Sequence, residues 1–257
     1  MTQADRTQLS EIEIQRHSFA HVLAMAALRV FKNTKIGIGA VVDNGFYQDF
    51  QFETPIGKSD LEKIEREMQS IIEEEVSFQQ LFVSKEQAFD ILNLQGQIFK
   101  TEILQNIAEE QVSFYRTGKE FIDLCRGPHV DHTGKLGAFK LISISGVYWN
   151  NDKTRPQLQR ILGVSFPTEA ELSNYFKERE AKKEKDHRKL GQKLDLFTFV
   201  ADNGSGLPIW LPKGFSVIDT IRNFVRKEQS KAGYTYVSTP SIVKSSVFED
   251  SSVPQSK

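Results

Sequence analysis

Residues 10–33 constrain the fold more than any other stretch, because they are expected to form a helix that is apolar on two sides. One stripe recurs at intervals of three and four residues and consists of Phe19, Val22, Leu23, Ala26 and Val30. A second face carries His17 and His21 and is continued by Ala24, Met25 and Leu28. Such a helix needs cover on both sides, so we expect the two histidines to line a sheltered space.

Strand-like segments follow this helix without a regular β-α-β alternation. The runs at 35–42 and 45–52 are joined at Asn44-Gly45, a pair typical of hairpin turns. Residues 59–75, with Ser59 as the N-cap, and two short stretches between Ser84 and Ile107 are expected to be helical. Residues 112–166 are again rich in strand-forming side chains broken by Gly, Pro and Asn. The order of elements predicts an α+β fold rather than a doubly wound sheet.

A basic segment follows Pro167 and is expected to form one long helical run that reaches about Leu190 and ends at Gly191. Between residues 177 and 193 it holds eight Lys or Arg and four Asp or Glu. A solvated helix laced with ion pairs would explain this composition as well as a contact with a phosphate backbone. Lys182, Lys185 and Arg188 are the candidates for such a contact.

Composition limits the class of protein. The 257 residues carry 33 Lys and Arg against 34 Asp and Glu, so no global basic excess indicates a nucleic-acid partner. A single cysteine cannot form an internal disulfide, and no apolar run reaches the roughly 20 residues of a membrane span. The first 15 residues are polar and lack the apolar core of a signal peptide. We expect a cytoplasmic protein with no membrane partner.

Two short motifs hold the residues suited to chemistry. His17 and His21 are four residues apart, and "DLCRGPH" at 123–129 contains the single Cys125 with His129 four positions later. Together these four side chains are a plausible zinc set, although Ser18 follows His17 where a metalloprotease motif needs Glu. Cys125 could equally be a nucleophile, the wall of a pocket or a buried core thiol. In the same stretch, Asp123 could orient a histidine or pair with Arg126.

The spelling and order of several motifs resemble one known family. They are "RHSFAHVLA", "GFYQDF", "DLCRGPHV", "AFKLISISGVYW", "LQRILGVSF" and "KDHRKLGQKLDLF". Over residues 16–197 this series resembles the editing domain and linker of threonyl-tRNA synthetases. Beyond Leu194 the chain resembles the start of a class II catalytic domain through its first motif, with Pro240 at the proline of that motif.

The resemblance implies a domain plan and a fold. A polar segment at 1–15 would precede an editing (second additional) domain at 16–167, in which helices wrap an antiparallel sheet. A basic linker helix would occupy 168–193, and the truncated start of the class II catalytic domain would occupy 194–257. Without the rest of that domain the chain is not expected to form threonyl-adenylate, and ATP and Mg²⁺ would serve only a full-length ligase.

The resemblance also implies an activity, which is hydrolysis of seryl-tRNA mischarged on tRNA(Thr). The expected partner is the acceptor end of tRNA(Thr), and a homodimer or an association with a full-length synthetase is the expected assembly. A catalytically silent tRNA-binding module and a non-functional fragment of a full threonine–tRNA ligase are the alternatives.

The family's site resembles a metal-free one, so we expect acid–base chemistry with no cofactor. The alternative is zinc at His17, His21, Cys125 and His129. His17 is expected to position water and Lys100 to be the second polar group on the water or ester. His21 and His129 are expected to position the ribose and the carbonyl, and Asp123 to support the histidines. Tyr47 is expected to contact the terminal nucleotide, and Arg126 to contact the tRNA. Cys125 as an acyl-forming nucleophile ranks below the water mechanism.

Overall fold

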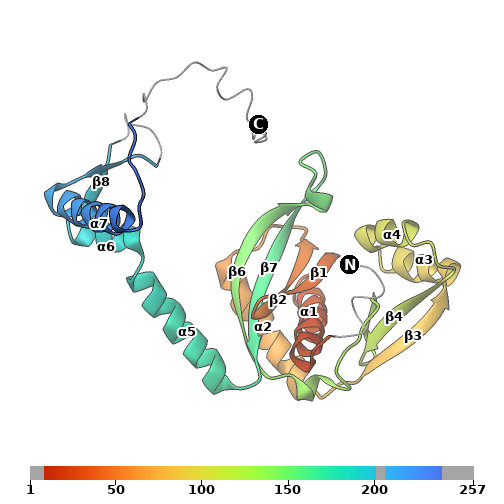
Figure 1. The fold of residues 1–257 in the computed structure, drawn as a ribbon. Coiled ribbons are helices and arrows are strands. Elements are labelled where there is room, and N and C mark those ends of the chain that lie inside the picture. Colours follow the sequence, from red (N-terminus) through yellow and green to blue (C-terminus); the bar gives the residue numbers. More distant parts are fainter. Residues whose placement is uncertain (1–8, 201–205, 239–257) are drawn as a thin grey trace, which may run out of the picture. The chain divides into compact units, whose positions relative to one another are not determined.

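The computed structural model describes residues 9–200 and 206–238 (Figure 1). The chain divides into two compact units, residues 1–178 and 179–257. Pro240 and the end of the expected class II motif lie outside the described residues, as does most of the polar segment at the start of the chain. The candidate chemistry lies in the first unit, so that unit is described first.

The described residues of the first unit form two antiparallel sheets and four complete helices. The helices are α1 (Glu11–Val30), α2 (Lys58–Glu73), α3 (Lys85–Leu94) and α4 (Ile98–Gln105). The strands are β1 (Lys35–Val42), β2 (Gly45–Gln51), β3 (Phe78–Ser84), β4 (Gln111–Thr117), β5 (Phe121–Leu124), β6 (Ala138–Tyr148) and β7 (Gln157–Phe166). Short 3₁₀ turns lie at Thr133–Lys135 and Trp149–Asn151. The expected mixture of helices and antiparallel strands is confirmed.

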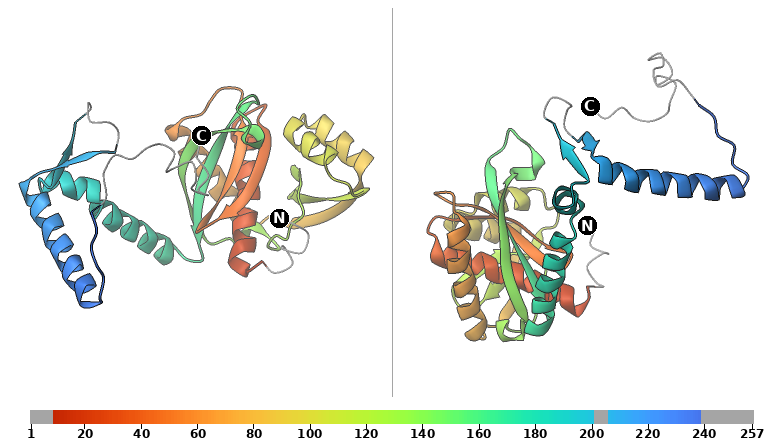
Figure 2. Two further views of the ribbon diagram at one scale, coloured as in Figure 1. Left: turned by 45° about the horizontal axis from the view of Figure 1, so that its top comes forward. Right: turned by 90° about the vertical axis from the view of Figure 1, so that its left-hand side faces the viewer.

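The larger sheet has the order β1-β2-β7-β6, and α1 and α2 pack against it (Figures 1 and 2). The hairpin expected at Asn44-Gly45 is present, since β1 and β2 pair antiparallel with Val42 opposite Gly45. The packing of α1 on this sheet is aromatic, with the rings of Phe19 and Phe46 stacked at 5.2 Å between centroids. A tight hairpin and a buried aromatic contact therefore fix where α1 crosses the sheet.

Helix α1 is buried on all sides through its middle turns, as its two apolar faces predicted. Ser10 caps the helix, and its backbone N–H donates to a carboxylate oxygen of Glu13 at 2.8 Å. Every residue from Ser18 to Ala27 is buried. The helix thus carries His17 and His21 from an exposed start into the interior.

The smaller sheet has the order β3-β4-β5, and α3 and α4 cover one of its faces. Leu81 and Val83 of β3 pack there against a small core of Ala88, Leu92, Leu104, Val112 and Phe114. Strand β3 was not anticipated from the sequence. The start of α2 also differs from expectation, because Gly57 rather than Ser59 is the N-cap and its N–H donates to Asp60 at 2.9 Å.

The expected single linker helix is wrong, because two helices occupy this segment. Helix α5 (Glu169–Glu184) ends before Asp186, and α6 (His187–Lys193) begins after it. The Asp186 carboxylate accepts from the N–H of Arg188 at 2.8 Å and so caps a new helix. Gly191 does not end the run; it lies buried inside α6, where a Cβ would come within 2.2 Å of the ring of Phe197.

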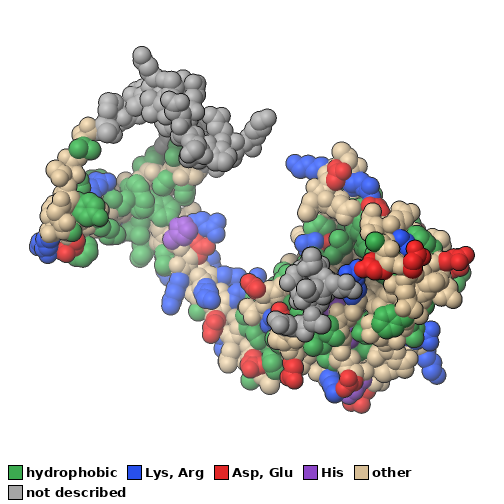
Figure 3. Space-filling model, turned by 45° about the vertical axis from the view of Figure 1, so that its right-hand side comes forward, with side chains coloured by type: hydrophobic (Ala, Val, Ile, Leu, Met, Phe, Trp, Pro, Cys, Tyr) green, Lys and Arg blue, Asp and Glu red, His purple; other side chains and the backbone are tan. Residues whose placement is uncertain are grey.

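The second unit also contains β8 (Phe197–Phe199), β9 (Pro208–Trp210) and α7 (Pro212–Lys231). β8 and β9 pair antiparallel, and the helix expected from about Phe215 is present as α7. Hydrophobic side chains are exposed along α7, at Phe215, Val217, Ile221, Phe224 and Val225 (Figure 3). In the part of the chain that the structure describes, no helix is long and apolar enough to cross a membrane.

Candidate functional site

A cavity of about 590 Å³ lies in the first unit, a size within the range of small-ligand sites. Its walls come from α1, the adjoining edge of β1 and β2, α4, the uncovered face of the smaller sheet and the turn at 125–128. The chemically relevant lining residues are His17, His21, Gln48, Lys100, Asp123 and Cys125. Segments that are far apart in the chain, from His17 in α1 to Pro128 in the turn after β5, therefore meet around one space.

The four candidate residues of the two motifs form one cluster. Sγ of Cys125 lies 3.3 Å from Nε2 of His17 and 3.3 Å from Nε2 of His129. Nδ1 of His21 lies 3.0 Å from Nε2 of His129. The rings of His17 and His129 stack at 4.4 Å between centroids. His17, His21 and Cys125 line the cavity, whereas His129 is not among the lining residues and supports them from behind.

The proton position on His17 follows from its neighbours. The carbonyl oxygen of Pro128 can only accept a hydrogen bond and lies 3.1 Å from Nδ1 of His17, so Nδ1 carries the proton. In the neutral imidazole, Nε2 then keeps its lone pair and faces the thiol of Cys125. His17 is therefore oriented as a base toward Cys125 and the cavity.

A second chain of hydrogen bonds fixes the other two histidines. The Ser18 hydroxyl donates its single proton to the carbonyl of Ile14 at 2.9 Å. It must therefore accept from Nδ1 of His129 at 3.1 Å and from the N–H of Val130 at 3.1 Å. Nε2 of His129 is then unprotonated and accepts from Nδ1 of His21. Ser18, which sequence reasoning considered only as a departure from a protease motif, thus fixes the tautomers of His129 and His21.

Both interior histidines are held neutral. Burial lowers the pKa of His21 well below its usual value, and the neighbouring His17 and Lys100 lower it further. Burial also lowers the pKa of His129, with additional contributions from His21 and His17. Because neither ring gains a proton at neutral pH, the hydrogen-bond directions given above persist there.

The turn after β5 brings Cys125 and His129 into place. Gly127 has a positive φ of 66°, and a Cβ at this position would lie 2.2 Å from the hydroxyl of Tyr115, so only glycine fits. The N–H of Gly127 donates to Sγ of Cys125 at 3.4 Å, and the N–H of Cys125 donates to the carbonyl of Ser113 at 3.1 Å. Backbone contacts on both sides therefore fix the thiol against the cavity.

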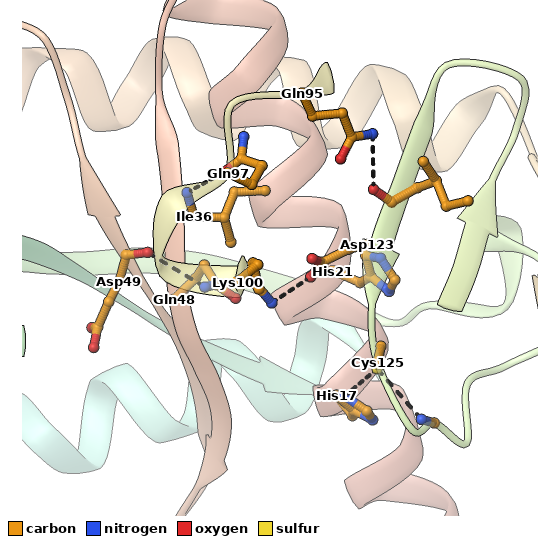
Figure 4. Close-up of polar contacts among 12 residues, drawn as sticks. His17, His21, Ile36, Gln48, Asp49, Gln95, Gln97, Lys100, Asp123 and Cys125 are labelled. Carbon is orange, nitrogen blue, oxygen red and sulfur yellow. Dashed lines mark hydrogen bonds and ion pairs between the residues drawn. The ribbon is translucent and has the colours of Figure 1, made fainter. Parts of the chain in front are cut away.

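A buried ion pair forms another part of the wall (Figure 4). Nζ of Lys100 lies 2.7 Å from a carboxylate oxygen of Asp123, and the two side chains are only 8% and 9% exposed. Gln48 lies on the other side of the Lys100 side chain. The partner found for Asp123 is thus Lys100, and Arg126 pairs instead with Glu109 at 3.6 Å on the rim.

Gln97 anchors the helix that carries Lys100. Its side-chain carbonyl accepts from the N–H of Ile36 at 2.8 Å (Figure 4). Its amide group donates to the carbonyl of Thr34 at 3.2 Å. The buried side chain therefore pairs with the edge of β1 as a neighbouring strand would. This contact holds the start of α4, and with it Lys100, against the larger sheet.

Some residues singled out from the sequence lie away from this cavity. Tyr47 alternates with Gln48 along β2 and so points to the opposite face of the sheet, where the guanidinium of Arg160 covers its ring at 3.7 Å. Lys182, Lys185 and Arg188 are exposed in the second unit. The sequence missed Gln48 as a wall residue, although its alternation with Tyr47 was the available signal.

The cluster offers ligand atoms suited to a metal as well as groups suited to acid–base chemistry. His17, Cys125 and His129 each present one such atom, and these atoms lie within 4.8 Å of one another. The lone pair on Nε2 of His129 is, however, already directed at Nδ1 of His21. Binding a metal through His129 would break that hydrogen bond, whereas proton transfer at His17 leaves the network intact.

Comparison with known proteins gives consistent relatives. Residues 112–161 match the family model for the threonyl and alanyl tRNA synthetase second additional domain. The chain is 44% identical over 236 residues to a threonine–tRNA ligase of Oleidesulfovibrio alaskensis, which covers 92% of this chain. It is 42% identical over 240 residues to that of Carboxydothermus hydrogenoformans and 43% identical over 243 residues to that of Dehalococcoides mccartyi, covering 93% and 95% of this chain.

These relatives are much longer than this chain. The matched regions span 36%, 38% and 41% of the three relatives. The similarity therefore concerns one region of such proteins. The family-model match at residues 112–161 includes Cys125 and His129.

Proposed function

Because this chain is homologous to the threonine–tRNA ligases over at least 92% of its length and carries their second additional domain, we propose that it is an editing hydrolase. Its substrate is seryl-tRNA(Thr), and the bond that it cleaves is the ester between serine and the terminal ribose. Aminoacylation is not part of the proposal.

The observation that supports this proposal most strongly is the pairing of a base and a cation on one cavity. His17 and Lys100 both line it. The carbonyl of Pro128 directs the Nε2 lone pair of His17 inward, and Asp123 holds the ammonium of Lys100 at 2.7 Å. Ester hydrolysis needs a group that takes a proton from water and a charge that stabilises the oxyanion, and these two side chains supply both.

The proposed reaction proceeds through attack by water. Nε2 of His17 takes one proton from a water molecule while the water oxygen bonds to the ester carbonyl carbon. The ammonium of Lys100 stabilises the negative charge that develops on the carbonyl oxygen. As the carbon–oxygen bond to the ribose breaks, the imidazolium of His17 returns the proton to the leaving ribose oxygen. The products are free serine and uncharged tRNA, and no acyl-enzyme forms.

Other members of the cluster are positioning residues in this scheme. Ser18 and His129 keep His21 in one tautomer, and the His129 ring stacks on that of His17, whose tautomer the carbonyl of Pro128 fixes. Cys125 forms a small wall beside the base. Its thiol donates a hydrogen bond to Nε2 of His17 until the attacking water replaces it as the donor. The reaction needs no metal in this scheme, because all proton transfers pass through His17.

Hydrolysis of seryl-tRNA(Thr) is needed because serine and threonine differ by only one methyl group. One methyl group supplies only about 1–3 kcal/mol of discrimination, so a synthetase selecting threonine makes errors with serine. A second site that accepts serine and excludes the larger side chain corrects them. Contact of the tRNA with Arg126 at the rim would hold its acceptor end at the cavity. The exposed Lys182, Lys185 and Arg188 of the second unit are candidates for a separate contact with its phosphate backbone.

Discharge of labelled seryl-tRNA(Thr) tests the proposal. We expect the protein to release serine and to leave threonyl-tRNA(Thr) intact. Tight tRNA binding with no release of serine would indicate the silent binding module instead. Metal analysis of the purified protein is the complementary measurement, and one tightly bound zinc per chain would overturn the metal-free mechanism.

A further inference from the structure

The uncovered face of the smaller sheet carries a row of side chains that leads away from Cys125. Phe82 of β3 lies opposite Ser113 of β4 in the antiparallel register. Ser113 in turn lies beside Cys125, since their backbones and the Ser113 hydroxyl are hydrogen-bonded. With neighbouring strands about 4.8 Å apart, Phe82 is about 10 Å from Cys125 along this row.

Phe82 points into the cavity rather than into a core. Its neighbours along the strand, Leu81 and Val83, pack toward α3 and α4, so the alternation of side chains turns Phe82 to the other face. The ring lines the cavity and is 62% exposed. A large aromatic ring that lines a cavity and contributes little to the core is suited to ligand contact, since ligand pockets are lined mainly by hydrophobic and aromatic side chains.

The surroundings of Phe82 differ from those of the histidine cluster. Ile38, Ile103 and Ile107 line the same cavity as apolar groups, and Gln80 and Gln111 add neutral amides. Gln80 and Gln111 lie on the same face of the smaller sheet as Phe82, so amide groups flank its ring, while the charged Glu109 and Arg126 of the lining pair with each other at the rim. An exposed aromatic face flanked by amide groups suits a flat, neutral ring with a polar edge.

We propose that the Phe82 ring is a stacking platform for the terminal nucleobase of the tRNA acceptor end. This inference rests on the proposed function, because the ester must lie at His17 for the base to reach Phe82. The separation of about two strand spacings matches the length of a nucleoside whose 3′ end is at the cluster. Aromatic stacking recognises the flat face of a base, so Phe82 contributes affinity for any purine rather than sequence discrimination.

Two small probes test this inference without the rest of the tRNA. The first is 3′-serylamino-3′-deoxyadenosine, whose amide resists hydrolysis, and the second is the same molecule with hydrogen in place of adenine. Calorimetric titration of the protein should show binding of the adenosine probe about ten-fold tighter than of the base-free probe. Phe82→Ala should remove most of that preference, and Phe82→Trp should keep it.

Matched variants separate stacking from general loss of apolar surface. Phe82→Leu retains an apolar side chain but no aromatic face, so it should behave like Phe82→Ala. Phe224→Ala removes a ring that is 63% exposed on α7 and should leave both affinities unchanged. Circular dichroism of each variant checks that the fold is intact, as expected for exposed rings.

The outcomes distinguish this inference from the proposed function. If the wild-type protein binds both probes equally, or if Phe82→Ala keeps the ten-fold preference, the stacking platform is refuted and the editing site stands. If the wild-type protein binds neither probe, the proposed function fails and the inference fails with it.

Discussion

Sγ of Cys125 and Nε2 of His17 are 3.3 Å apart although the two residues are 108 positions apart in the chain. This contact joins the start of α1 to the turn after β5 and resembles the thiol–imidazole pair of a cysteine hydrolase. Because Nε2 of His17 faces both the thiol and the cavity, its lone pair could take a proton either from Cys125 or from a water molecule. In the proposed scheme, the lone pair activates water and the thiol is a wall.

The first prediction concerns Cys125. We expect Cys125→Ala to retain at least a tenth of the wild-type rate of serine release, because no bond to sulfur forms in the water mechanism. Mass spectrometry of wild-type protein quenched during turnover should show no seryl adduct. A loss of activity of a hundred-fold or more together with a seryl adduct on the wild-type protein would assign the nucleophile to Cys125.

The second prediction concerns Gln97 as an anchor of α4. Gln97→Ala leaves the N–H of Ile36 and the carbonyl of Thr34 without their partner, so the free energy of unfolding should fall by about 2 kcal/mol. Gln95→Ala is the matched control, since this exposed glutamine makes only one long hydrogen bond of 3.4 Å to Ile122. Urea unfolding should show a change below about 0.5 kcal/mol for the control. Equal effects of the two substitutions would refute the anchoring role.

The third prediction follows from the lowered pKa values of His21 and His129. Above about pH 6.5 both histidines are neutral in the folded and unfolded chains, so they do not affect the pH dependence. Below that pH the unfolded chain binds protons that the folded protein does not, so the free energy of unfolding decreases as the pH is lowered. From pH 6 to pH 5 the two groups should together lower the free energy of unfolding by about 2 kcal/mol.

Variants isolate this effect from the carboxylates that also titrate. His129→Asn should reduce the loss between pH 6 and pH 5 by about 1 kcal/mol, measured by urea unfolding at each pH. His187→Asn, at a side chain that is 84% exposed, should leave the loss unchanged. An identical pH dependence in the His129 variant and the wild-type protein would show that His129 is not held neutral in the fold.

The fourth prediction tests the basic segment. Replacing Lys182, Lys185 and Arg188 by Ala should reduce the salt dependence of tRNA binding. The slope of log K against log salt concentration should become shallower by about one for each phosphate that is no longer neutralised. The control replaces Lys63 and Lys135, which form exposed ion pairs with Asp60 and Asp131 in the first unit. Filter binding across a range of salt concentrations measures both slopes. An unchanged slope in the triple variant would identify the segment as a solvated helix.

The elements that were predicted well have strong local signals. Helix α1 has a capping serine, a glutamate three residues later and two apolar faces, and the β1–β2 hairpin has Asn-Gly at its turn. Strand β3 was missed because Gln79 and Gln80 interrupt its apolar alternation. The break in the linker was missed because the cap at Asp186 outweighs the helix-forming residues around it.

The candidate site likewise has parts that local motifs predicted and parts that depend on tertiary contacts. The two motifs brought His17, His21, Cys125 and His129 to attention, but their hydrogen-bond order depends on Ser18 and on the carbonyl of Pro128, which no spacing rule indicates. The pairing of Lys100 with Asp123 depends on how α4 docks beside β5, a tertiary contact. Phe82 was not singled out because its strand was not recognised.

The most direct measurement is single-turnover discharge of seryl-tRNA(Thr) and threonyl-tRNA(Thr) by the wild-type protein, His17→Ala and Lys100→Ala. We expect the wild-type protein to release serine at least ten-fold faster than threonine, in keeping with discrimination by one methyl group. Each variant should lose a hundred-fold or more of that rate, as expected when a base or an oxyanion-stabilising charge is removed. Serine release by the wild-type protein at the spontaneous rate, or unchanged release by both variants, would contradict the editing site at His17 and Lys100.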